Sequence, residues 1–300
     1  TSKTYFQKCL EIYPELISDT YSRKTLKDLK DKLEKELWSA RFEIGGKYTF
    51  VIPDLYAFCE YLFMGKENPK GLLKDGEVCC RLFNDGKELD CLRSPHLYRE
   101  HPIRKNNTNY DWFDTNGIYV SSHDFISRVL QNDFDGDKLL VTDNEMLVKI
   151  AKRNMKNIVP LYYNMSKAKA EIITSDSLYN GLINAYNGGN IGIPSNDITK
   201  IWNSGEITKE KIDVIKWLCL EVNFTIDYAK TLYKPKRPNN VNSIINKYTK
   251  AKIPYFFMFA KGKKREQVNK IGDNIMDRIS IIYPKKRLNF NFKIENIGRF

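Results

Sequence analysis

Residues 45–145 constrain the fold most, because short segments of β-forming residues follow one another there with turns between them. The segments are GGKYTFVI, EVCCRLF, LDCLR, GIYVSS and DKLLVTD, and runs such as KDG, NDGKE and KNNTN separate several of them. Two short helical stretches, residues 53–63 and 122–131, interrupt the series. Irregular strands mixed with short helices predict a compact β-barrel rather than a βαβ sheet.

Helical patterns flank this region on both sides. Leucines recur at helical spacing among dense charges in residues 21–42, which is typical of an amphipathic surface helix. A second apolar stripe runs through residues 209–232 and should end before KPKRP, where two prolines block a helix. We therefore expect an α+β protein with an N-terminal helical segment (1–44), a barrel (45–145) and a mostly helical, basic C-terminal region (146–300).

The charge balance favours an anionic partner. Lysine and arginine number 49 against 37 acidic residues, which gives a formal net charge of +12. Nucleic acid is the leading candidate for such a surface. An AT-rich coding sequence, which inflates lysine, asparagine and isoleucine everywhere, is an alternative explanation for part of this charge.

Cysteine usage and hydropathy indicate an intracellular protein. The six cysteines form no CxxC pair, and with three histidines they show no zinc-binding spacing. We expect reduced and mostly buried thiols. No apolar stretch approaches the roughly 20 residues of a membrane span, and no signal peptide opens the chain. A cytoplasmic location and no membrane partner are therefore expected.

Three aspartates alternate in the stretch QNDFDGDKLLVT, residues 131–142. In an extended backbone, Asp133, Asp135 and Asp137 would lie on one side, where their carboxylates repel unless a cation sits among them. Magnesium or manganese, which prefer oxygen ligands, meet that need. A calcium loop of the EF-hand type is excluded, because its glycine position holds Lys138 and its final glutamate position holds Asn144. A solvated acidic turn remains the structural alternative.

The sequence DFDGD resembles the D-x-D-G-D signature of two-barrel RNA polymerases, which include single-chain phage and prophage enzymes and the RNA-silencing polymerases. Three further stretches in the matching order resemble the same family. CLRSPHLYREHPI (91–103) is similar to its arginine-containing strand and turn, and residues 119–142 to the second half of its double-psi β-barrel. EVNFTIDYAKTLYKPKRP (221–238) is similar to the helix that follows the barrel, with Asp227 and Lys230 in the family positions. The resemblance covers roughly residues 75–240.

This resemblance implies an active site and a function. It assigns Asp133, Asp135 and Asp137 as catalytic ligands of Mg²⁺, with Mn²⁺ as a substitute, in the attack of an RNA 3′-hydroxyl on the α-phosphate of a nucleoside triphosphate. It places Arg93 near the ribose or the product end. Binding of the template or hybrid backbone is expected from a set of basic residues that includes Lys230, Lys234 and Arg237.

The resemblance also implies partners. Nucleoside triphosphates, a template and the RNA product are the expected ligands. Family members carry a first, lysine-bearing barrel upstream, for which about 130 residues before the aspartates leave no room. We therefore expect that barrel on another chain or on an N-terminal part not included here, a view in line with the start at Thr1. The AT-rich character of the coding sequence favours a bacterial or phage source, whose relatives in the family mostly copy DNA, so we expect an enzyme that acts on DNA in the host cytoplasm.

Several alternatives stay open at this point. The template could be RNA, or the chain could be a non-catalytic nucleic-acid-binding subunit that keeps the aspartates for a structural cation. A metal-dependent nuclease is a weaker third option. His96 and His123 are candidate proton donors, although a lone histidine beside a barrel turn is more often structural. The aromatic run at residues 255–259 favours core packing over base stacking.

Overall fold

The computed structural model describes residues 4–163, 166, 168–250, 252–272 and 275–290. Its contacts divide the chain into two compact units. Unit 1 is drawn from Thr1–Phe42, Asn203–Gly205 and Ala251–Phe300, and unit 2 from Glu43–Trp202 and Glu206–Lys250. The expected boundaries after residues 44 and 145 remain predictions about domain organisation.

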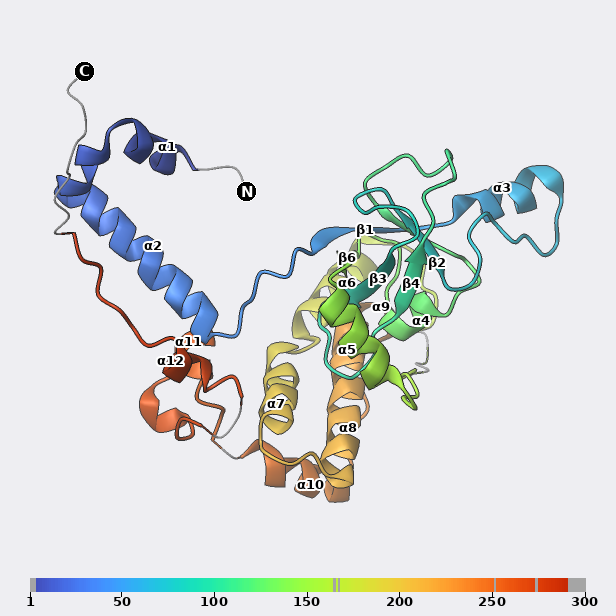
Figure 1. The fold of residues 1–300 in the computed structure, drawn as a ribbon. Helices are drawn as coiled ribbons and strands as arrows, with labels where there is room; N and C mark the ends of the chain where they lie inside the picture. The colour runs from blue at the N-terminus through green and yellow to red at the C-terminus, as the bar shows by residue number, and fades with distance from the viewer. Residues whose placement is uncertain (1–3, 164–165, 167, 251, 273–274, 291–300) are drawn as a thin grey trace. The chain divides into compact units, whose positions relative to one another are not determined.

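Unit 2 contains a closed six-stranded barrel, as the short β-forming segments in residues 45–145 predict (Figure 1). Its strands are β1 (Lys47–Pro53), β2 (Glu77–Cys80), β3 (Glu88–Arg93), β4 (Ile103–Asn106), β5 (Ile118–Val120) and β6 (Lys138–Thr142), in the spatial order β1-β5-β2-β4-β3-β6. The pairs β1–β5 and β2–β4 are parallel and the others antiparallel. The barrel therefore mixes both kinds of pairing, which a simple meander does not.

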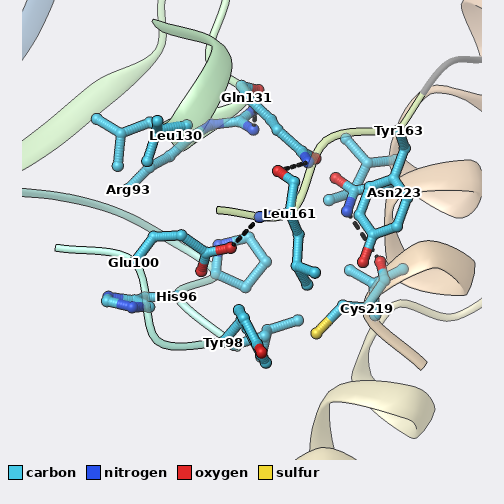
Figure 2. A pocket seen from close by; sticks show the side chains of 15 residues that line it. Arg93, His96, Tyr98, Glu100, Leu130, Gln131, Leu161, Tyr163, Cys219 and Asn223 are labelled. Carbon is cyan, nitrogen blue, oxygen red and sulfur yellow. Dashed lines mark hydrogen bonds between the residues drawn. The ribbon is translucent and has the colours of Figure 1, made fainter. Parts of the chain in front are cut away.

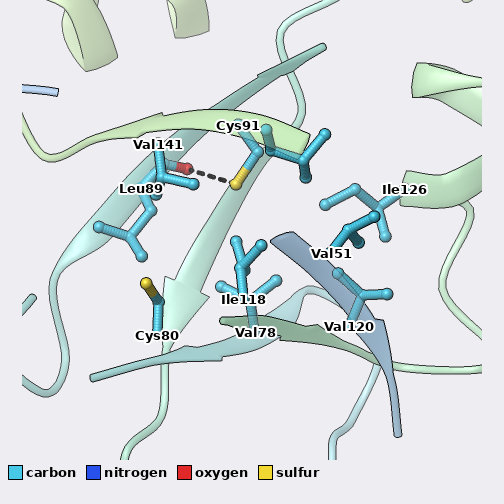
Figure 3. Packing of buried hydrophobic residues seen from close by; sticks show 10 residues of the cluster. Val51, Val78, Cys80, Leu89, Cys91, Ile118, Val120, Ile126 and Val141 are labelled. Carbon is cyan, nitrogen blue, oxygen red and sulfur yellow. Dashed lines mark hydrogen bonds between the residues drawn. The ribbon is translucent and has the colours of Figure 1, made fainter. Parts of the chain in front are cut away.

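Alternate residues of β2, β3, β5 and β6, together with Val51 of β1, fill the barrel (Figure 3). Val78, Leu89, Ile118, Leu139 and Val141 are fully buried. Ile126 closes the same core from the short helix α4 (Ile126–Leu130). Because β6 belongs to this core and pairs with both β1 and β3, the loop that precedes it ends at a fixed position.

The remaining helices of unit 2 are α3 (Leu55–Met64), α5 (Glu145–Met155), α6 (Ser175–Asn187), α7 (Gly192–Trp202), α8 (Lys209–Ile226), α9 (Tyr228–Thr231) and α10 (Asn239–Thr249). Of these, α7, α8 and α10 form a second hydrophobic core. The apolar stripe predicted for residues 209–232 is the buried face of α8, where Ile215, Leu218 and Val222 pack against α7 and α10. Thr208 caps its start by accepting the Lys211 N–H, and the regular helix ends at Ile226.

Helix α3 buries its polar groups and exposes its apolar ones. The carboxylate of Asp54 accepts the N–H groups of Leu72 and Leu73, and that of Glu60 accepts those of Lys70 and Gly71. Both carboxylates are thereby used to hold the loop that follows the helix. Large apolar side chains remain at its surface, namely Leu55, Phe58, Tyr61, Leu62, Phe63 and Met64.

Unit 1 joins segments from the two ends of the chain. Its elements are α1 (Tyr5–Ile12), the 3₁₀ turn η1 (Pro14–Ser18), α2 (Thr20–Trp38), α11 (Phe257–Ala260), η2 (Arg265–Gln267) and α12 (Ile279–Ile282). Trp38 donates its indole N–H to the Tyr283 carbonyl at 2.9 Å. The ring centroids of Trp38 and Phe259 lie 5.1 Å apart, with the two rings tilted to each other. Phe257 packs into a small core with Ile253 and Val268, so the core interpretation of the aromatic run is confirmed. Across the described residues of both units, no helix combines the length and apolar character needed to cross a bilayer.

Candidate active site on the aspartate loop

Three carboxylates converge in the loop between α4 and β6. One oxygen from each of Asp133, Asp135 and Asp137 lies within 4.8 Å of the others. We expected an extended backbone from the sequence, and this expectation is wrong: the backbone bends at residues 134–136. Gly136 adopts a φ of +126°, a conformation that a residue with a Cβ takes up only with strain. The side chains therefore meet because the loop turns around them.

Backbone hydrogen bonds fix the base of this loop. The Asp133 N–H donates to Oδ2 of Asp137 at 3.1 Å, which closes the loop on itself. The Val51 N–H of β1 donates to the Asp137 carbonyl at 3.0 Å, which ties the loop to the barrel. The carboxylate of Asp137 is consequently the most enclosed, with 22% of its side chain exposed against 48% for Asp133 and 62% for Asp135.

Two cationic side chains reach the carboxylates from other elements. Arg93, the last residue of β3, places a guanidinium nitrogen 2.9 Å from Oδ2 of Asp137. Lys230, on the short helix α9, donates its ammonium group to Oδ2 of Asp133 and to Oδ2 of Asp135, the latter at 3.2 Å. The structure thus brings both of these sequence-predicted residues to the aspartates, where they offset the mutual repulsion of three carboxylates.

These contacts shift the ionisation of the site. The hydrogen bond from Lys230 holds the pKa of Asp133 below its ordinary value, and the same bonds raise the pKa of Lys230. Nearby Asp227 behaves in the opposite way, because burial raises its pKa. Asp133 and Lys230 are therefore both charged near neutral pH.

A cavity of about 70 Å³ lies behind the loop, between the barrel, the segment around Leu161 and helix α8 (Figure 2). Arg93 borders it and donates to the Gln131 carbonyl as well as to Asp137. The Gln131 side chain donates to the Leu161 carbonyl at 3.3 Å, and the Leu161 N–H donates to Oε1 of Glu100 at 2.7 Å. This chain of hydrogen bonds connects the aspartate loop to two distant segments.

Sequence reasoning missed Gln131, Leu161 and Glu100 as members of this network. Gln131 stands next to the aspartates in sequence, but no spacing rule connects it with the other two. Burial raises the pKa of the Glu100 carboxyl group.

Some polar atoms around the aspartate loop have no hydrogen-bond partner among the described residues, namely Nε of Arg93 and both amide atoms of Asn132. Such buried, unpaired groups are rare in folded proteins and leave hydrogen-bonding capacity for a ligand.

The surroundings of His96 and His123, the two candidate proton donors, do not suit that role. Burial and the nearby His101 ring lower the pKa of His96 to about 4, so its imidazole is neutral near pH 7. A neutral ring of such low basicity is a poor proton donor. A ring nitrogen of His123 lies within hydrogen-bonding distance of the Pro69 carbonyl oxygen. Neither geometry favours proton donation at the aspartates.

Lys234 and Arg237 line a different hollow, of about 400 Å³, to which the three aspartates do not contribute. Arg237 donates through two nitrogens to the Glu221 carboxylate, each at 2.6 Å, and Lys234 donates to the Gly188 carbonyl. The structure therefore does not bring these two predicted nucleic-acid contacts to the aspartate loop. Their proposed role depends on a nucleic acid that reaches from one hollow to the other.

Comparison with known proteins gives one informative match. No protein-family model matches the chain. The chain is 49% identical over 292 residues to the DNA-directed RNA polymerase YonO of Bacillus phage SPbeta. The match covers 96% of this chain and 34% of that protein. The chain thus spans about a third of the length of the curated relative it matches.

Proposed function

We propose that this chain is the aspartate-bearing catalytic part of a template-directed RNA polymerase. The observation that carries the proposal is the convergence of three carboxylates on a solvent-accessible loop of a closed barrel. The 49% identity to a phage DNA-directed RNA polymerase supports it independently. The parallel pairs β1–β5 and β2–β4 within six strands further support a barrel of the double-psi type, with DFDGD as its D-x-D-G-D loop.

The residues of the loop fit a divalent metal. Asp133, Asp135 and Asp137 offer hard oxygen ligands close together, and the ammonium group of Lys230 already lies against two of them. Three carboxylates without sulfur or imidazole ligands suit Mg²⁺, with Mn²⁺ as a substitute. Bound there, the metal would supply the charge neutralisation that nucleotidyl transfer requires.

The chain's own residues supply positioning. Arg93 contacts Asp137 and Gln131 together, so it orients the loop relative to the end of β3. Its fork of donors suits a ribose or phosphate oxygen as well. Phosphoryl transfer asks a protein mainly for positioning and for stabilisation of charge, and this site has groups for both.

The template and the partners follow from the same proposal. A DNA template is favoured because the relative is named a DNA-directed polymerase, and its phage origin favours action inside a bacterial host. Ribonucleoside triphosphates and an RNA product complete the set of ligands. The resemblance also implies a first barrel whose lysines contact the phosphates. That barrel would come from a further segment of the protein or from another chain, equivalent to the part of the phage polymerase that this chain does not match.

A graft tests this proposal in a complete enzyme. This chain would replace its matching 292 residues in the SPbeta phage polymerase, and labelled RNA would be measured with four nucleoside triphosphates, Mg²⁺ and a DNA template. We expect RNA synthesis from the graft, and a loss on the order of 10²-fold or more for Asp135→Asn. The exposed Asp111 provides the matched control, since Asp111→Asn removes the same charge away from the loop.

Each outcome of the graft experiment is informative. RNA synthesis that persists in a folded Asp135→Asn graft would contradict the proposal. Synthesis that responds to an RNA template and not to DNA would retain the chemistry and overturn the choice of template. Comparable loss in Asp111→Asn would attribute the effect to folding, and circular dichroism of both variants would detect that loss of structure.

A further inference from the structure

The ammonium group of Lys230 lies where a metal ion bound by Asp133 and Asp135 would lie. This group contacts Oδ2 of both Asp133 and Asp135. Helix α9, which carries it, is a single turn that ends where Leu232 adopts a left-handed conformation, with φ of 50°. Some 57% of the lysine side chain is exposed. The cation is thus attached by a long, solvated stem to the end of a short helix.

Arg93, the other cation of the site, is held much more tightly. Only 16% of its side chain is exposed, and it contacts Asp137 and the Gln131 carbonyl simultaneously. A planar guanidinium with two fixed acceptors is a permanent part of the loop's support. Lys230 has neither enclosure nor a second type of anchor, since both of its contacts are to the exposed carboxylates. The two cations therefore differ in how readily they can leave.

A divalent ion and the Lys230 ammonium need the same oxygens. Both cannot contact Asp133 and Asp135 closely, because their charges repel at that separation. An ammonium released from the carboxylates is a compact, strongly hydrated cation that binds phosphate oxygens well. The triphosphate of an incoming nucleotide brings such oxygens to this loop if the proposed function holds.

We propose that Lys230 is an exchangeable catalytic cation: it holds Asp133 and Asp135 together before the metal binds, and then transfers to the phosphates of the incoming nucleotide. This inference rests on the proposed function, and it changes the role of Lys230 from a template-backbone contact to a triphosphate contact. The repulsion among the carboxylates is offset at each stage by one cation or another. The loop accordingly keeps its shape with and without metal.

Metal affinity is the first test and needs no enzymatic activity. Binding of Mn²⁺ to the 300-residue chain would be measured by electron paramagnetic resonance of the free ion. Lys230→Met should tighten binding by about fivefold, as expected for removal of one competing, partly exposed ion pair. Lys138→Met is the matched control, because Lys138 follows the loop directly but lies over the Phe50 ring at 4.4 Å. It should change Mn²⁺ affinity by less than about twofold.

Chemical reactivity of the lysine is the second test. Acetylation of Lys230 in the wild-type chain, followed by mass spectrometry, reports whether its amine is held by the carboxylates. Adding Mg²⁺ should increase its acetylation rate, and adding ATP with Mg²⁺ should lower the rate again. Lys138 should show neither change. A Lys230 rate that does not respond to Mg²⁺ would overturn the exchange.

The outcomes separate this inference from the proposed function. Equal Mn²⁺ affinity of the wild-type chain and Lys230→Met leaves the metal site intact and refutes competition by the lysine. No Mn²⁺ binding by either chain removes the metal site and, with it, both proposals. Lys230→Gln serves as a second variant, and circular dichroism verifies that each variant is folded. Weaker binding in both folded variants would assign Lys230 a supporting role and refute the exchange.

Discussion

Individual side chains around the aspartate loop divide into enclosed and exposed groups. Asp137 and Arg93 form an ion pair of which 22% and 16% of the side chains are exposed, whereas Asp133, Asp135 and Lys230 remain open to solvent. Enclosure weakens screening by water and salt, so the Arg93–Asp137 pair is the electrostatically stronger support. The open groups are the ones that can exchange partners. This division separates residues that hold the loop from residues that can act on a ligand.

At the same scale, His96 predicts a pH dependence of stability. Its pKa is about 4 in the folded chain against an ordinary value of 6.5, because burial disfavours the charged ring. Between these values the unfolded chain binds a proton that the folded chain does not, so the free energy of unfolding falls as pH falls through this window. Because His96 is more than a third exposed, solvent screening reduces this effect, and urea denaturation should show a loss of no more than about 1 kcal/mol from this residue between pH 7 and pH 5. In His96→Leu, this part of the loss should vanish.

The comparison isolates His96 from its neighbours. His101, Asp90 and Glu100 face the same region and are present in both proteins, so whatever they contribute is common to both curves. Parallel curves for the wild type and His96→Leu would show that the ring is not protonated differently on unfolding.

Elements of the barrel were predictable where side-chain alternation is strong. The segments around β1, β2, β3, β5 and β6 alternate or are continuously apolar, and each forms a strand. Strand β4 (Ile103–Asn106) escaped prediction, because its sequence IRKN contains one apolar residue and runs into a turn-like stretch of asparagines. It forms because β2 and β3 provide hydrogen-bonding partners on both sides. Such partners come from distant sequence and leave no local pattern.

The same reasoning explains what sequence could say about the site. The three aspartates were found because they are neighbours, and Arg93 and Lys230 because their flanking motifs resemble a family. The bend that brings the carboxylates together was not foreseen, since it depends on the φ of Gly136 and on the bond from Val51 to the Asp137 carbonyl. Contacts such as Gln131 with Leu161 have no signature at all.

Strand β6 should show how strongly the barrel core supports the loop. Leu139, the second residue of β6, is fully buried two positions after Asp137. Leu139→Ala should lower the free energy of unfolding by about 2–5 kcal/mol, because it leaves a cavity in a closed core. The matched control is Leu62→Ala on α3, where 54% of the leucine is exposed and the expected loss is below about 1 kcal/mol. Urea denaturation followed by circular dichroism measures both, and equal losses would contradict this assignment of the core.

On the scale of the whole molecule, segments from the N-terminal and C-terminal parts of the sequence meet within unit 1. The Trp38 indole bonds to the Tyr283 carbonyl across 245 positions of sequence, a pairing that no local pattern predicts. Net charge, by contrast, can be read directly from the sequence and amounts to +12. It acts on the molecule as a whole, since many separate cations attract a polyanion without forming one defined pocket. Its consequence is a measurable dependence of nucleic-acid binding on salt.

The 300-residue chain should bind a labelled single-stranded oligonucleotide with an affinity that falls about 10- to 100-fold between 50 and 200 mM NaCl, because each phosphate contact releases a counterion. Fluorescence anisotropy measures this dependence. If Lys234 contacts a phosphate, Lys234→Met should reduce the slope of log affinity against log salt by about 0.7. Lys152→Met is the matched control, since Lys152 pairs with Glu88 and should leave the slope unchanged. An affinity that does not respond to salt would contradict an electrostatic partner, and an unchanged slope in Lys234→Met would remove that residue from the nucleic-acid surface.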